Sequence, residues 1–444
     1  MPETKNNNET HIKGITWGHS RGYTPLAAAA QRYSELHPGT IITWDKRSLQ
    51  QFADFPIEEL TKSYDLLIID HPWMGTAART QAVLPFDLHL PTDYLRDQAE
   101  NSVGYSHQSY NYQGHQWALA IDAATPVASY RPDLLAKAGL NVPDTWEDVL
   151  AIAGKGRLAV PAIPIDLLMN FYMFCIAHGS RPFQSDQHII DTATGEAALQ
   201  TMVQLYRLID KKCWNANPIA IAEYMTTTDD YWYCPFAYGY SNYSREGYAS
   251  NKLTYADLVY FTAPTQSGTQ VGVGMPLAAP RMDVIDKLQS QRKIIRSAEG
   301  DIPRRPSRES NPPARLRSTI GGTGLAISAT SKHIPACLDF ARWICSPTTQ
   351  STFYTEHGGQ PGHREAWLND KTNRLTNNYF YTVLPAMERG YMRPRYHGYL
   401  YFQDHAGDPI RDFLLGQRDC KSTLQTLDDL YIQSLKNQPI SIVS

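Results

Sequence analysis

The sequence has no apolar run that approaches the roughly 20 residues needed to span a membrane. Its N-terminal segment, residues 1–14, is polar and rich in asparagine, and it lacks the apolar core of a signal peptide. Taken as written, the sequence therefore predicts a protein that stays in the cytoplasm, unless its N-terminus is truncated.

Cysteine is scarce, and none of the six cysteines forms a Cys-x-x-Cys pair, so the pattern of a zinc or redox site is missing. The 14 histidines form no His-Glu-x-x-His motif, and no EF-hand spacing occurs. We therefore expect no metal and no cofactor. We expect the cysteines to be buried free thiols, with one disulfide as the alternative.

No charge of one sign dominates, since 41 Lys and Arg residues stand against 44 Asp and Glu residues for a net charge of −3. This balance gives no electrostatic basis for nucleic-acid binding. The sequence is instead rich in aromatic rings, with 27 Tyr and 9 Trp. Such rings suit a site for polar organic ligands, and they equally suit an aromatic core.

The first third of the chain alternates strand and helix patterns. Three segments have the pattern of strands, at 12–17, 40–44 and 64–70. A helix with proline in its first turn is predicted at 25–36. This order predicts a parallel sheet, whose ligands bind at the carboxyl ends of the strands. The loops at that edge are 18–23, 45–51 and 71–75.

Polar and aromatic side chains gather in these three loops. The candidate ligand contacts are His19, Ser20, Arg21, Arg47, His71 and Trp73. A ring such as Trp73 can stack on the apolar face of a sugar, and Arg47 can bridge hydroxyls or pair with an acid. The alternatives are core packing for Trp73, a solvated charge for Arg47 and an ordinary strand-to-helix turn for the first loop.

The first loop also carries Gly-x-Ser-x-Gly at Gly18–Gly22, the motif of the nucleophile elbow of α/β-hydrolases. In that interpretation Ser20 attacks an acyl carbon, and Asp404 with His405 is the nearest match for the rest of the triad. The elbow normally follows several strands of the sheet, whereas only one predicted strand precedes it here. A serine hydrolase is therefore kept as a less favoured hypothesis.

Residues 111–148 carry the most informative pattern of the chain. A turn at Gly114 is followed by a strand that ends in Asp122, then by a second strand, a helix that stops at Gly139 and a helix capped by Thr145. In the order of its segments and in its local sequence, this stretch resembles the family 1 extracellular solute-binding proteins, the two-lobed receptors of sugar-type ABC importers.

The resemblance spans most of residues 12–436 and implies an α/β, two-lobed, periplasmic-binding-protein-like fold of type II, with a mostly parallel sheet in each lobe and a hinge between them. The implied lobes are 12–121 plus about 271–345, and 122–270 plus about 346–444. Residues 282–316 interrupt the family pattern with many arginines and prolines and poor periodicity. We predict an insertion without regular structure there, or an error in the gene model.

The resemblance also completes the predicted site. Asp122 would accept hydrogen bonds from two sugar hydroxyls, with a hinge or cap role as the alternative. Further contacts would come from Asn170, Tyr238, Tyr240, Asn242 and Tyr243 across the cleft, and from the backbone of Gly322 and Thr323.

We therefore predict a protein that is not an enzyme and that binds a small polar solute, a carbohydrate or sugar derivative, by closing its lobes. His19, Arg21 and Arg47 favour a ligand with an acidic or acylated group. The resemblance implies an ABC-transporter permease as partner and a location outside the inner membrane, and we expect a monomer. A cytoplasmic ligand-binding or sensor protein of the same fold remains the main alternative.

Overall fold

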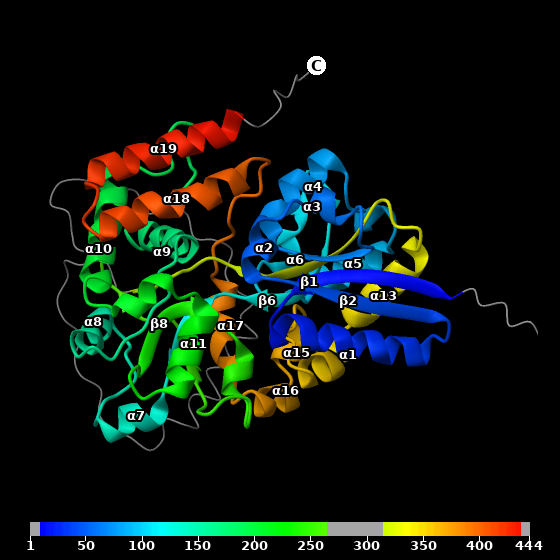
Figure 1. The fold of residues 1–444 in the computed structure, drawn as a ribbon, viewed down its shortest axis with the longest axis horizontal. Helices are drawn as coiled ribbons and strands as arrows, with labels where there is room; N and C mark the ends of the chain where they lie inside the picture. The colour runs from blue at the N-terminus through cyan, green and yellow to red at the C-terminus, as the bar shows by residue number, and fades with distance from the viewer. Residues whose placement is uncertain (1–8, 264–313, 437–444) are drawn as a thin grey trace, which may run out of the picture.

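The computed structural model describes residues 9–263 and 314–436 of the chain. Figure 1 shows two lobes side by side, one built around the N-terminal strands and one around the middle of the chain and the two C-terminal helices. Four buried hydrophobic clusters fill these lobes. None of the described helices is long and apolar enough to cross a membrane.

The first lobe is built on a five-stranded sheet with the strand order β2-β1-β3-β12-β6. Its strands are β1 (Thr10–Trp17), β2 (Thr40–Arg47), β3 (Leu66–Ile69), β12 (Gly321–Ile327) and β6 (Leu119–Ala124). The first three run parallel, as predicted, and β3 is buried along its whole length, as a central strand should be. Strand β12 joins antiparallel between β3 and β6.

Helix α1 (Ser20–Leu36) connects β1 to β2 and begins five residues before the predicted start at Pro25. His19 caps the helix because its Nδ1 accepts a hydrogen bond from the backbone of Arg21 at 3.0 Å. The predicted start is therefore wrong, and Pro25 lies inside the helix. The next loop is also shorter than predicted, because a capping box at Ser48 starts α2 (Leu49–Asp54).

The second lobe has a three-stranded sheet in the order β8-β7-β9, formed by Tyr233–Tyr238, Pro126–Tyr130 and Thr254–Ala256. These strands run antiparallel, unlike the mostly parallel sheet predicted for each lobe. Most of the lobe is helical and includes α9 (Pro164–Ala177), α10 (Thr192–Tyr206), α11 (Pro218–Thr227), α18 (Tyr399–Leu414) and α19 (Cys420–Lys436). Helix α9 is apolar on nearly all sides because the others surround it.

Three segments meet where the lobes join. Only Thr125 separates β6 in the first lobe from β7 in the second, and its hydroxyl donates to the carbonyl of Thr319 at 2.9 Å. Thr319 in turn pairs with Tyr391. After the predicted lobe limit near 345, Tyr354 still packs with the cluster on the first sheet, and the exact division into lobes stays a prediction.

The predicted insertion lies mostly outside the described residues. Its last residues are described, and Ala314–Arg315 pairs antiparallel with Tyr260–Phe261 in the second lobe. The cysteines are all unpaired, and five of the six are buried, while Cys420 is partly exposed.

Candidate functional site

A cavity of about 460 Å³ opens between the two lobes, at the carboxyl ends of β1 and β3. The first lobe contributes Trp17, Arg21, Phe52, Asp70, Gly322 and Thr323 to its wall. The second lobe and its connections contribute Asp166, Met169, Tyr238, Tyr240, Arg393 and Asp404. The size is within the range of small-molecule sites, and the strand ends are where open α/β sheets bind ligands.

Aromatic rings cover one part of the cavity wall. The ring centroids of Trp17 and Phe52 lie 5.3 Å apart, and the indole Nε1 of Trp17 is buried without a hydrogen-bond partner in the described structure. Gly22 makes room for the indole, because a Cβ there would lie 2.4 Å from Trp17 ring atoms. This part of the wall therefore combines aromatic rings with a buried indole N–H that has no partner among the described residues.

A buried ion pair lies beside the rings. The Nε and Nη2 atoms of Arg21 donate to the two carboxylate oxygens of Asp122 at 2.9 and 2.5 Å, and Nη1 donates to the Gly239 carbonyl at 3.0 Å. Burial by itself would lower the pKa of Arg21, but the Asp122 carboxylate raises it above its ordinary value. The charge of Arg21 is thus balanced inside the protein, and its hydrogen bond to Gly239 joins the two lobes.

A second ion pair crosses the cavity wall. Arg393 donates from Nη2 to Asp70 at 2.6 Å and from Nη1 to Gln403 at 2.8 Å. Although burial raises the pKa of Asp70, the Arg393 guanidinium and a hydrogen bond from His71 hold it well below its usual range. The Nε of Arg393 is buried and has no partner among the described residues.

Asp166 differs from Asp70 and Asp122 because no cation of the described residues pairs with it. It lies in the first turn of α9 and is only 6% exposed. Its Oδ2 has no hydrogen-bond partner in the described structure, and burial raises its pKa to about 8. A carboxyl group in this state accepts or donates a hydrogen bond readily when a ligand arrives.

The glycine-rich strand β12 approaches the cavity closely, as the sequence predicts. Gly322 has φ +103, and a Cβ there would lie 2.3 Å from the carbonyl oxygen of Asp122. The hydroxyl of Thr323 is buried without a partner in the described structure. Within the described residues, no group of three or more His, Cys, Asp or Glu side chains is placed to hold a metal ion.

The arrangement of a cavity between two α/β lobes agrees with comparisons of the sequence with known families. Residues 17–351 match the family described as bacterial extracellular solute-binding protein. The chain belongs to this family. No curated protein matches the sequence.

Solved structures of solute-binding proteins share the fold of this chain. The maltose-bound MalE3 of T. maritima superposes with a TM-score of 0.72 at 14% identity, over 95% of this chain and 99% of that one. A solute-binding protein from Thermotoga lettingae bound with α-D-tagatose superposes with a TM-score of 0.73 at 15% identity, over 96% of this chain and 100% of that one. A solute-binding protein from Agrobacterium radiobacter K84 in complex with ribitol superposes with a TM-score of 0.70 at 18% identity, over 96% of this chain and 98% of that one.

The cavity of this solute-binding protein brings together five of the predicted site residues: Arg21, Tyr238, Tyr240, Gly322 and Thr323. Asp122 lies behind them, with both carboxylate oxygens engaged by Arg21. The hydroxyl of Tyr238 lies 2.8 Å from that of Thr319.

Four predicted residues face the protein interior instead. Arg47 donates to the Ile68 carbonyl at 3.0 Å from beneath the ring of Phe52. Trp73 packs in the core below the sheet, and His71 is buried next to Asp70. Asn170 donates to the Tyr206 hydroxyl at 2.8 Å, one turn of α9 away from Asp166.

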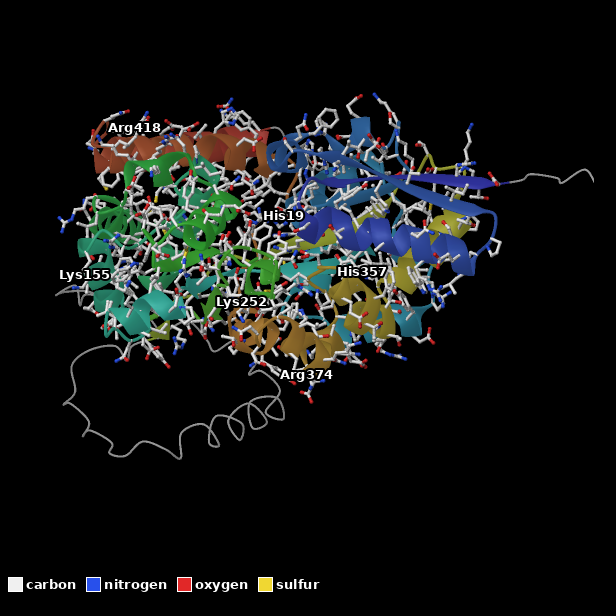
Figure 2. All side chains as sticks on the ribbon, turned by 60° about the horizontal axis from the view of Figure 1, so that its bottom comes forward. His19, Lys155, Lys252, His357, Arg374 and Arg418 are labelled. Carbon is white, nitrogen blue, oxygen red and sulfur yellow. The ribbon has the colours of Figure 1, made fainter. Side chains whose placement is uncertain are left out.

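The remaining four join the lobes beside the cavity. Figure 2 labels His19 at the boundary between the lobes, where its ring meets the edge of Tyr240 at 4.7 Å. Asn242 donates to the hydroxyl of Ser20 at 3.1 Å, and Tyr243 donates to Glu223 at 2.6 Å. Burial lowers the pKa of His19 to about 4.

Sequence reasoning missed Trp17, Asp70, Asp166 and Arg393. The first two had a signal, since Trp17 ends β1 and Asp70 directly follows β3, where side chains of a parallel sheet reach the ligand edge. Arg393 had none, because it lies in a connection that only tertiary structure brings to the cavity.

Proposed function

We propose that the protein binds a polyhydroxylated solute without net negative charge, a carbohydrate or sugar derivative, reversibly in the cavity between its lobes, as the substrate-binding component of an ABC importer. The observation that carries this proposal is the pairing of ring faces with partnerless polar groups in one cavity, namely the Trp17 indole, the Thr323 hydroxyl and the Arg393 Nε. Sugars present hydroxyls at their edges and C–H groups on their faces, which such a wall complements.

The charges of the cavity do not support the acidic ligand that the sequence suggested. Arg21 and Arg393 are each paired with a carboxylate, and Arg47 does not line the cavity. His19 is uncharged near neutral pH because burial lowers its pKa to about 4. Among the described residues, an anion would therefore meet no unpaired cation in the cavity, but would meet the carboxyl groups of α9 and α18.

The mode of binding follows from the position of the cavity. Periplasmic binding proteins bind by hinge closure, in which two lobes move together around a ligand. Closure excludes water from many hydrogen bonds at once and creates a surface that a partner can recognise. The solved neighbours bound to maltose, tagatose and ribitol support a polyol ligand.

The serine-hydrolase alternative gains no support from the contacts of Ser20. Its hydroxyl lies 2.5 Å from the Tyr248 hydroxyl and accepts from Asn242. Neither partner is a general base at neutral pH. A sensor of the same fold remains the alternative role for the same binding activity.

Isothermal titration of the purified protein with maltose, tagatose, ribitol and glucuronate tests the proposal. We expect binding of at least one neutral polyol, recovered unchanged, and none of glucuronate. Trp17→Ala should weaken that binding by about tenfold or more, since a stacked ring contributes on the order of 1–2 kcal/mol. Phe55→Ala, which removes a ring that is 43% exposed and outside the cavity, is the matched control. Failure of every neutral polyol tested would overturn the proposal.

A further inference from the structure

One wall of the cavity is acidic. Helices α9 and α18 run next to each other in the second lobe (Figure 1), and they contribute Asp166, Asp404 and Asp408 to the cavity. Asp404 and Asp408 are four residues apart, so they share one face of α18. Both are exposed, whereas Asp166 is buried at the inner end of this wall.

The cations of the cavity leave Asp166 without compensation. Arg21 is held in a two-point contact by Asp122, and Arg393 is held by Asp70 and Gln403. The Oδ2 of Asp166 has no partner among the described residues although the side chain is more than nine-tenths buried. A buried carboxyl group without hydrogen bonds is costly, so such a group signals a missing partner.

Other groups of the cavity wall offer the complementary chemistry. The Nε1 of Trp17, which packs against Phe52, is a buried donor without a partner in the described structure, and so is the Nε of Arg393. The cavity thus combines a donor in the first lobe and a donor on Arg393, which is bonded to Gln403 of α18, with the carboxyl groups of α9 and α18. These groups are matched by a solute that carries both acceptors and a strong donor.

We propose that the solute carries a protonated amine, which binds between Asp166 and the carboxylates of α18, as in an amino sugar. This inference rests on the proposed function and names the chemical class of the ligand. An ammonium group has three donors and no acceptor, which fits a wall of carboxyl groups. The N-terminal end of the 14-residue helix α9 stabilises Asp166 as a carboxylate once a cation is bound, and the resulting contact is a charge-assisted hydrogen bond.

The test is calorimetry of the full chain with matched sugars: glucose, N-acetylglucosamine and glucosamine, and the β-1,4-linked dimers of the same three. We expect the amine-bearing member of a set to bind at least about tenfold more tightly than its hydroxyl and N-acetyl counterparts, as for a buried charged contact. In Asp166→Asn this preference should fall to about threefold or less, while binding of the neutral sugars changes little.

Asp186→Asn, at an exposed aspartate outside the cavity, is the matched control and should keep the full preference. Circular dichroism and thermal melting verify that Asp166→Asn is folded. Equal or tighter binding of the neutral sugars, or a preference for amines that survives in Asp166→Asn, would overturn the inference and leave the proposed function standing. If no sugar of the six binds, and the polyols named above also fail, both proposals are wrong.

Discussion

Asp166 is a side chain whose acid–base state depends on the fold. Burial raises its pKa from 3.8 to about 8. Between these values the folded protein holds a proton that the unfolded chain has released, so the free energy of unfolding falls as the pH rises through this window. The nearby Tyr206, Tyr238 and Cys234 have pKa values raised by burial above their ordinary values, which places their titration above the window.

We therefore predict that Asp166→Asn removes part of the pH dependence of stability. The variant should be close to the wild type in stability at about pH 5 and clearly more stable at about pH 8.5, because the amide does not ionise. Denaturant unfolding of both proteins at the two pH values measures this difference. A difference that does not grow with pH would show that the Asp166 pKa is not raised.

The Arg21–Asp122 pair gives a second prediction. Both side chains are buried, at 4% and 1% exposure, so removing one partner leaves the other charge without compensation. Asp122→Asn should lower the free energy of unfolding by about 3–5 kcal/mol. Asp45→Asn, which removes the partner of Lys13 in an exposed pair, should cost less than about 1 kcal/mol. Equal effects of the two substitutions in denaturant unfolding would contradict the assigned burial.

The turn from β1 into α1 shows how one short motif serves packing. Gly18–Gly22 matches the hydrolase pattern by letters, but Gly22 is needed because the indole of Trp17 occupies the space of a Cβ. Ser20 is then simply the first residue of the helix that His19 caps. The motif therefore positions the aromatic wall of the cavity. The packing of Trp17 is enough to explain the glycine at position 22, without a nucleophilic role for Ser20.

Gly22→Ala is therefore predicted to displace Trp17. The overpacking should cost about 1–3 kcal/mol of stability and weaken solute binding together. Gly154→Ala is the control, because it lies at the end of α8 (Trp146–Gly154) with no atom within 4 Å of its added Cβ. That change should be neutral or stabilise the protein by up to about 1 kcal/mol. Thermal melting and calorimetry of both variants check the prediction, and a harmless Gly22→Ala would refute it.

Elements with local signals were predictable from the sequence. The helix that Thr145 caps, which begins with a capping box to Asp148, and the apolar strand β3 are both present. A helix start that lacks a common capping residue was not predicted correctly, as at His19, which caps α1. At the start of α19, Asp419 accepts from the backbone of Ser422 at 2.9 Å and so caps the helix.

At the level of the whole molecule, the two-lobed fold followed from the order of segments, but the site only in part. Tyr238 and Gly322 lie at ends of strands near the lobe junction, and Tyr240 follows two residues after the end of β8, so their position could be inferred. Asp122 was equally well placed by its position in the sequence. Whether its carboxylate is open to a ligand depends on Arg21, which is 101 residues away in the chain and engages both of its oxygens. Partners so distant in sequence leave no periodic signal, and neither does the wall formed by α18.

The thiols of the protein determine how lobe closure can be observed. Five are buried, and Cys420 at the start of α19 is the partly exposed one, so a maleimide dye should react there first. A second dye at Leu36→Cys, at the exposed end of α1 in the other lobe, would complete an energy-transfer pair. With only Thr125 between β6 and β7, a small rotation there would change the distance between the dyes, so the fluorescence of a single molecule would report when a solute is bound.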